Sequence, residues 1–260
     1  MASPLRRARW LLVLAALAVA ACGGTDRERT PATSTFGRGT EVTYATEDGV
    51  RISATLRLPP GGATRRAPAV VLVHQLGGDR HDFNALLPAL GRAGYATLAY
   101  DIRGMGRSNG MVDGTVFRPG TDRDAYRATM LRDVTAALDF LRRRRDIDGE
   151  RLAVIGSSLG ANVAIAASAA RRGPAATVAV SPVAGAAPVS SLDRRLRGIL
   201  LIADRAEIGS VWTLARRLDR PKRVTLAQRE GHGVMLLPDG SVQAEIVEWL
   251  ARHLRGRPLD

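Results

Sequence analysis

The segment "VIGSSLG", residues 154–160, joins an apolar run to an alanine-rich run through two serines bracketed by glycines. Residues 156–160 fit the pattern G-x-S-x-G, in which the serine lies on a sharp turn between a strand and a helix. Glycine suits the positions two residues to either side, because there is little room for a Cβ atom beside such a turn. The pattern therefore selects Ser158 as the candidate nucleophile and makes Ser157 the variable position.

The residues around this segment favour a strand-turn-helix unit over an incidental turn. An apolar strand-like run precedes the turn, and residues 159–172 after it have helical spacing. The first amides of a helix have no partner within the helix. The amide of Leu159 can therefore donate a hydrogen bond to an oxyanion that forms at Ser158.

Short apolar runs without alternation recur along the chain and predict strands that are covered on both faces. These runs occupy residues 68–74, 95–101, 151–156, 176–181, 198–203 and 222–227. Segments with helical spacing lie between them, at residues 82–94, 124–145, 159–172, 210–218 and 241–256. Residues 41–59 alternate around "EDG" and predict an antiparallel hairpin. The sequence thus predicts an α/β fold with a mainly parallel sheet of about eight strands and helices on both faces.

Four motifs in this order resemble the α/β-hydrolase superfamily, and most of all its serine esterase and dienelactone-hydrolase-like members. The motifs are "VVLVHQLGGDRHDF", "YDIRGMGRS", "VIGSSLG" and "REGHGVMLL", and the resemblance covers residues 41–256. It implies the α/β-hydrolase fold and a hydrolase that needs no metal or organic cofactor. Members of the family often insert a cap domain where this chain has residues 182–198, so little or no cap is expected. A partial cover within residues 109–131 is the alternative.

The general base is expected to be a histidine with free access to the serine. His232 lies in "EGHG", between the last predicted strand and the last predicted helix, and a glycine flanks it on each side. A neutral imidazole in such a loop can take the serine proton. The resemblance places the family's base here and implies that His74 is structural.

The acid that orients the histidine falls between the serine and the histidine in chain order. The loop "ILLIADRAEIGSVW" offers Asp204 directly after the strand and Glu207 three residues later. The family pattern G-x-x-D matches Glu207 to the acid, so Glu207 is predicted and Asp204 is the alternative. A glutamate can serve, because the acid only has to orient the imidazole and stabilise imidazolium.

The resemblance also implies the second oxyanion donor. The family has a His-Gly pair at the end of the third strand, where this chain has His74 and Gln75. The donor is then the amide of Leu76, with Gln75 as an alternative.

The N-terminus predicts export. Arg6, Arg7 and Arg9 precede the apolar run "WLLVLAALAVAA", and small residues lead to Cys22, the single cysteine of the chain. This order is typical of a secretory signal peptide. "VAAC" also resembles a bacterial lipobox, which predicts a signal peptide over residues 1–21 and lipidation of Cys22. The alternative is an ordinary signal peptide with an incidental cysteine.

The segment after Cys22 is polar and rich in glycine, threonine and proline, as expected of a flexible tether over residues 22–40. The hydrolase domain then occupies residues 41–260. These predictions describe a lipoprotein anchored to a membrane through Cys22, on the periplasmic or extracellular side of a bacterial envelope.

The net charge of +13 is a weak functional signal, because the arginines are spread along the chain. Their one dense run, residues 142–145, falls at a predicted helix end, where positive charge suits the helix dipole. No nucleic-acid partner is expected. The sequence predicts a serine hydrolase acting on carboxylic esters with small or exposed acyl groups. A peptidase on the same fold and a non-catalytic lipoprotein are the alternatives.

Overall fold

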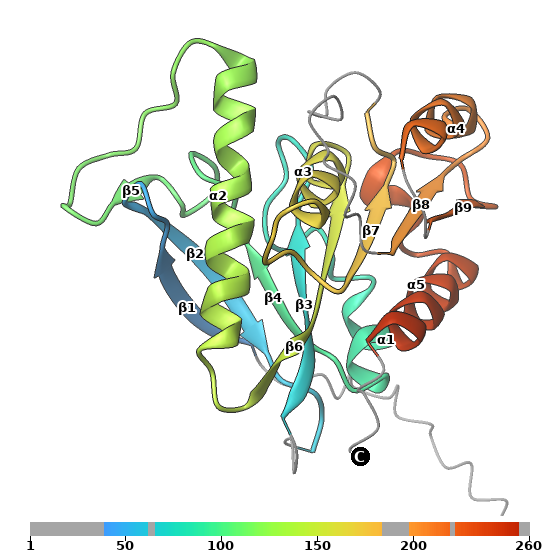
Figure 1. Ribbon diagram of the computed structural model, residues 1–260, viewed down its shortest axis with the longest axis horizontal. Coiled ribbons are helices and arrows are strands. Elements are labelled where there is room, and N and C mark those ends of the chain that lie inside the picture. The colour runs from blue at the N-terminus through green and yellow to red at the C-terminus, as the bar shows by residue number, and fades with distance from the viewer. Residues whose placement is uncertain (1–38, 62–65, 184–197, 219–221, 255–260) are drawn as a thin grey trace, which may run out of the picture. The chain divides into compact units, whose positions relative to one another are not determined.

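A computed structural model describes residues 39–61, 66–183, 198–218 and 222–254, and these form a sheet covered by helices on both faces (Figure 1). Eight strands follow the order β1-β2-β4-β3-β6-β7-β8-β9, and the short β5 pairs with β2. The strands are β1 Thr40–Ala45, β2 Val50–Arg57, β3 Ala67–Val73, β4 Ala96–Tyr100, β5 Gly110–Met111, β6 Ile147–Ser157, β7 Ala176–Val180, β8 Ile199–Ala203 and β9 Lys222–Leu226.

The hairpin β1-β2 forms the antiparallel edge, and β2 is also antiparallel to β4. All neighbouring pairs along the order β4-β3-β6-β7-β8-β9 are parallel. Both the edge hairpin and the parallel centre are thus confirmed. The carboxyl ends of β3, β6, β7 and β8 therefore meet at one edge of the sheet, which is where ligands bind in open α/β sheets.

The helices divide between the two faces of the sheet. They are α1 Leu87–Arg92, α2 Arg123–Arg142, α3 Leu159–Ser168, α4 Ile208–Arg217 and α5 Gly240–His253, with the 3₁₀ helix η2 at Gly233–Leu236. The helices α2, α3 and α4 bury their apolar side chains on one face, and α1 and α5 on the other. Because both faces are covered, the central strands are almost wholly buried, which is why their sequences lack alternation.

Two predicted elements have different boundaries in the structure, and one short strand was not predicted. The helix predicted over residues 82–94 is helical only from Leu87, where Pro88 falls in the first turn, and turns precede it. The strand predicted at residues 151–156 extends back to Ile147 through an irregular register against β3. The strand β5 was not predicted, because two residues carry no periodicity.

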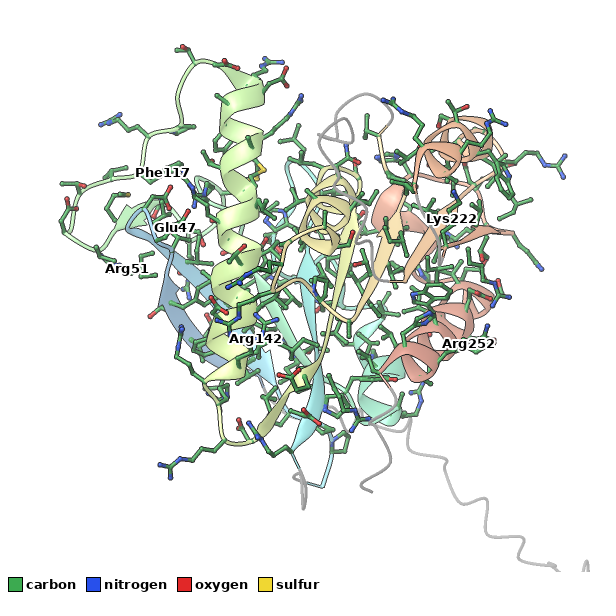
Figure 2. The ribbon with its side chains drawn as sticks, viewed as in Figure 1. Glu47, Arg51, Phe117, Arg142, Lys222 and Arg252 are labelled. Carbon is green, nitrogen blue, oxygen red and sulfur yellow. The ribbon has the colours of Figure 1, made fainter. Side chains whose placement is uncertain are left out.

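The segment between β4 and α2 is bound to the hairpin by β5. The Arg51 guanidinium donates to the Met111 carbonyl oxygen (2.5 Å), and Figure 2 labels Arg51 and Phe117 at this end of the sheet. Part of the partial cover considered for residues 109–131 is therefore an extension of the sheet edge. The region in which a cap was not expected falls largely in residues 184–197, outside the described residues, as do Cys22 and the signal peptide.

None of the helices in the described part of the chain is both long and apolar enough to cross a membrane.

Candidate active site

The G-x-S-x-G turn consists of a single residue between a strand and a helix. Ser158 follows the last residue of β6 and precedes the first residue of α3, with φ 51° and ψ −113°. A positive φ is unusual for a residue with a side chain and persists only where the surroundings enforce it. The Ser158 amide is held by the Val180 carbonyl oxygen of the neighbouring strand at 2.8 Å.

The two glycines of the motif allow backbones to cross. A Cβ atom on Gly156 would lie 2.0 Å from the Gly160 carbonyl oxygen. A Cβ atom on Gly160 would lie 2.1 Å from the Val73 carbonyl oxygen. Both separations are far below van der Waals contact, so the turn requires glycine at these two positions.

The adjacent serines have different surroundings. The Ser157 side chain is fully buried and its hydroxyl donates to Gln75 Oε1 at 3.2 Å. Ser158 retains 9% exposure, and its Oγ lies 2.7 Å from His232 Nε2. Ser158 is therefore the serine that has a histidine partner.

The histidine bridges the serine and a carboxylate. His232 directly precedes η2, and its Nδ1 makes a short contact with Glu207 Oε1. With Nδ1 protonated and bonded to the carboxylate, Nε2 is free to accept the Ser158 proton. The structure thus brings Ser158, His232 and Glu207 into one hydrogen-bonded chain. The site is partly open to solvent, since the His232 side chain is 45% and the Glu207 side chain 28% exposed.

The two candidate carboxylates take different positions. Glu207 is the N-cap residue of α4, but its carboxylate makes no capping bond and turns to His232. Asp204 is buried, and its carboxylate accepts the amides of Glu207 (2.9 Å) and Gly231 (3.1 Å). Among the described contacts, Asp204 has no hydrogen bond to His232. The amide bonds, that from Gly231 most of all, lower the pKa of Asp204 below its usual range.

The loop after β3 presents the amide of Leu76. Among the described residues, neither this amide nor that of Leu159 has a hydrogen-bond acceptor. The positive φ of this loop falls on Gly77 (78°) and not on Gln75, so the side chain at Gln75 causes no strain. The Gln75 carbonyl oxygen accepts from Gly78 N (3.1 Å) and His74 Nδ1 (2.7 Å), which fixes the turn that presents Leu76.

The His74 ring is an internal brace. It is fully buried, and its Nε2 accepts the amide of Ile102 at 2.9 Å. Its two nitrogens thus bond to the backbone just after β3 and just after β4. These bonds are consistent with the structural role that the family resemblance implies for His74.

A pocket of about 310 Å³ has an apolar lining that includes the two residues whose amides are the candidate oxyanion donors. It is lined by Leu76, Arg123, Tyr126, Arg127, Met130 and Leu159. The sequence did not indicate that side chains of α2 line this pocket. Helical spacing shows which face of a helix is buried, but not which end of the helix lies beside the loop that follows β3. This pocket is at the small end of the range for ligand sites.

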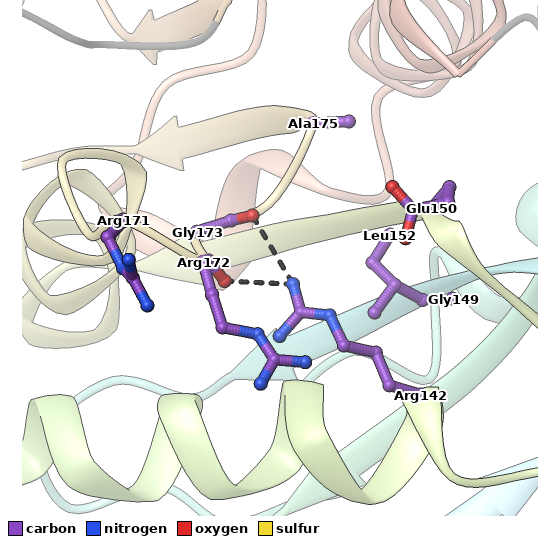
Figure 3. Close-up of a pocket in the computed structure, with 8 residues that line it drawn as sticks. All are labelled: Arg142, Gly149, Glu150, Leu152, Arg171, Arg172, Gly173 and Ala175. Atoms are coloured by element: carbon purple, nitrogen blue, oxygen red, sulfur yellow. Dashed lines mark hydrogen bonds between the residues drawn. The ribbon is translucent and has the colours of Figure 1, made fainter.

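A second hollow, of about 180 Å³, contains none of the predicted site residues (Figure 3). It lies where α2 ends, and the Arg142 guanidinium there donates to the carbonyl oxygens of Arg172 (2.8 Å) and Gly173 (3.5 Å). Arg142 also pairs with Asp139 at 3.0 Å. The start of the four-arginine run therefore makes local bonds at the helix end.

Residues 70–259 match the model of the alpha/beta hydrolase family. The chain belongs to this family. This alpha/beta hydrolase is also 30% identical over 241 residues to the uncharacterized protein Rv2307c of Mycobacterium tuberculosis, covering 83% of this chain and 80% of the relative.

Solved structures show the same fold. This alpha/beta hydrolase is similar to the esterase Pf2001 of Pyrococcus furiosus, with a TM-score of 0.68, 19% identity and coverage of 87% of this chain and 96% of the esterase. It is also similar to a dienelactone hydrolase of Anabaena variabilis, with a TM-score of 0.66, 20% identity and coverage of 84% and 99%. The fold and these neighbours support a hydrolase.

Proposed function

We propose that this protein is a serine hydrolase that cleaves carboxylic esters by acyl transfer. The observation that carries the proposal is the continuous chain of contacts from Ser158 Oγ through the His232 ring to Glu207. In the proposed reaction, Ser158 Oγ attacks the ester carbonyl carbon while His232 Nε2 takes the hydroxyl proton. Glu207 holds Nδ1–H and stabilises the imidazolium that forms.

The tetrahedral intermediate then has an oxyanion near the amides of Leu76 and Leu159. These two N–H donors would stabilise a negative charge that appears only as Ser158 Oγ bonds to the carbonyl carbon. Because the bound substrate does not yet carry this charge, the donors lower the energy of the transition state more than that of the substrate. Collapse of the intermediate breaks the ester C–O bond, and the alcohol leaves with the proton from His232. Water attacks the acyl-enzyme with help from His232, and this step releases the carboxylic acid and restores the Ser158 hydroxyl.

The substrate class follows from the pocket and the neighbours. A pocket of about 310 Å³, lined by apolar atoms that include those of Leu76 and Leu159, suits a small acyl group. Ester hydrolysis is favoured over peptide hydrolysis because the solved neighbours include an esterase and a dienelactone hydrolase. A non-catalytic role is the alternative, and Gln75, which replaces the family's glycine, could favour it. Gln75 accepts the Val234 amide, however, and Asp204 of the acid loop accepts the Gly231 amide, so both support the loop that carries His232.

Turnover of p-nitrophenyl acetate tests the reaction. Ser158→Ala is expected to reduce kcat by at least about a thousandfold, because it removes the nucleophile and leaves only oxyanion binding. Ser157→Ala is the matched control, a neighbouring serine whose hydroxyl faces Gln75, and it should keep kcat within about tenfold of wild type. A wild-type protein without turnover, or a Ser158→Ala variant with wild-type turnover, would contradict the proposal.

We also propose that residues 1–21 direct export and that a lipid on Cys22 tethers the hydrolase domain to a membrane. The support is the order of charged, apolar and small residues before Cys22. Incorporation of labelled fatty acid into the wild-type protein, and its loss in Cys22→Ser, is the expected result. Equal labelling of both proteins, or of neither, would contradict it.

A further inference from the structure

The loop that carries His232 is held by side chains from the ends of three different strands. Three of its backbone amides donate to side-chain oxygens: Gly231 N to Asp204 Oδ2 (3.1 Å), Gly233 N to Ser181 Oγ (2.8 Å) and Val234 N to Gln75 Oε1 (3.3 Å). These acceptors follow β8, β7 and β3 respectively. The two residues that flank His232 in the chain are thus each fixed from outside the loop.

Ser181 is held in an unusual conformation at the end of β7. It is 1% exposed and has φ 50°, and Ser158 is the only other described residue besides glycine with a positive φ. Such a conformation is strained for a residue with a side chain and clusters at functional sites. Its Oγ accepts the Gly233 amide at 2.8 Å.

Asp204 connects the loop of the base to the loop of the acid. One oxygen of its carboxylate accepts the Gly231 amide and the other accepts the Glu207 amide. A single buried carboxylate therefore sets the distance between the backbones that carry His232 and Glu207. The short contact between these two side chains depends on that distance.

Gln75 contributes a third acceptor at the position where the family pattern has glycine. Its Oε1 accepts both the Val234 amide and the Ser157 hydroxyl (3.2 Å). It therefore ties the loop after His232 to the residue before Ser158.

We infer that Asp204, Ser181 and Gln75 are positioning residues that fix the His232 imidazole between Ser158 and Glu207. The reason that positioning is needed lies in the exposure of the base. With its side chain 45% exposed, His232 has few packing contacts to hold its ring, so its backbone must be held instead. The inference rests on the proposed serine hydrolase, because a position is tested through the reaction that needs it.

The bonds that Asp204, Ser181 and Gln75 make to the loop of His232 are here called the clamp. Two variants test it, one on each side of His232. In Asp204→Asn, an NH₂ group replaces one oxygen and faces one of the two backbone N–H groups, so one bond is lost. Ser181→Ala removes the acceptor of Gly233 N without adding bulk. A misplacement of a catalytic group by about 1 Å can cost a factor of about 100, so kcat for p-nitrophenyl acetate should fall about 10- to 100-fold in each. KM should stay within about twofold, because neither side chain lines the pocket beside Leu76.

Asp239→Asn is the matched control. Asp239 also accepts two backbone amides, those of Arg229 (3.2 Å) and Ser241 (2.8 Å), but neither residue adjoins His232. Its kcat should stay within about twofold of wild type, even if its melting temperature falls as much as that of the other two. A structural role alone would lower the melting temperature and leave kcat of the folded fraction unchanged.

The outcomes separate the two proposals. A fall in kcat at constant KM in Asp204→Asn and Ser181→Ala, but not in Asp239→Asn, supports the clamp. Wild-type kcat in Ser181→Ala, or an equal loss in Asp239→Asn, overturns it while leaving the serine hydrolase intact. Should Asp204→Asn fail to fold, the kcat of Ser181→Ala is sufficient to support or overturn the clamp. A wild-type protein without ester turnover overturns the proposed function, and the clamp with it.

Discussion

Replacing Glu207 by glutamine should reduce kcat by about three orders of magnitude while the fold persists. The change keeps the shape of the side chain but exchanges a carboxylate for an amide. The amide NH₂ would donate to His232 Nδ1, which forces the ring proton onto Nε2 and turns that atom from an acceptor into a donor. Nε2, which lies 2.7 Å from Ser158 Oγ, could then no longer take the serine proton.

The magnitude follows from the exposure of the pair. Loss of a fully buried triad carboxylate costs about 10⁴ in kcat. Here the histidine is 45% and the glutamate 28% exposed, so water can partly replace the carboxylate and a smaller loss is expected. A loss of about 10³ corresponds to about 4 kcal/mol in the activation barrier.

The assay is steady-state hydrolysis of p-nitrophenyl acetate, with Glu230→Gln as the control. Glu230 is an exposed carboxylate two residues from His232, so this variant loses the same charge from the same loop. Its kcat should remain within about threefold of wild type. A Glu207→Gln variant with kcat within threefold of wild type would refute the assignment. An Asp204→Asn variant that loses more than Glu207→Gln would show that Asp204 is the acid.

Three further perturbations test the pocket lined by Leu76, the turn at Ser158 and the ion pair between Arg103 and Asp48, which lies in the turn between β1 and β2. Leu76→Trp should narrow the pocket and so lower the ratio of kcat/KM for p-nitrophenyl hexanoate to kcat/KM for the acetate by about tenfold. Val116 is equally exposed, at 62%, but does not line the pocket, so Val116→Trp should leave this ratio unchanged. Gly160→Ala should lower the melting temperature and abolish turnover, because the new Cβ would lie 2.1 Å from the Val73 carbonyl oxygen. Overpacking of this kind costs about 1–3 kcal/mol of stability. A variant with wild-type stability in calorimetry would contradict this prediction. The Arg103 bond to Asp48 (2.7 Å) holds the pKa of that carboxyl well below its usual range. Because the unfolded chain takes up this proton first, the unfolding free energy should fall as pH drops below about 4. In urea titrations at pH 5 and pH 3, Asp48→Asn should show a smaller fall in unfolding free energy than the wild type. An unchanged pH dependence would show that the Arg103–Asp48 ion pair does not cause it.

The strand pattern was predictable because fully covered parallel strands leave a simple signature. Residues 68–74 and 176–181 are mostly apolar and do not alternate with polar side chains, and the structure covers both faces of each. The turn at Ser158 was predictable for a related reason. Gly156 and Gly160 are required by backbone crossings that no other residue type permits, so the sequence records the geometry directly.

The partners of His232 were only partly predictable. Both Asp204 and Glu207 follow β8 closely enough to be the acid, and the choice depends on the direction that the chain takes after the strand. The roles of Ser181 and Gln75 could not be predicted from the sequence, because their partners lie 52 and 159 residues away. A serine before proline after a buried strand was the one local signal for Ser181, and it is too common to single out a site.

The most direct test of the central claim is covalent labelling by a fluorophosphonate, with the modified residue located by peptide mass spectrometry. We expect one label per wild-type chain, located on Ser158, with labelling lost in Ser158→Ala and strongly slowed in His232→Ala. Ser157→Ala should still be labelled on Ser158. A wild-type protein that stays unlabelled, or a Ser158→Ala variant that labels at the wild-type rate, would show that Ser158 is not the nucleophile.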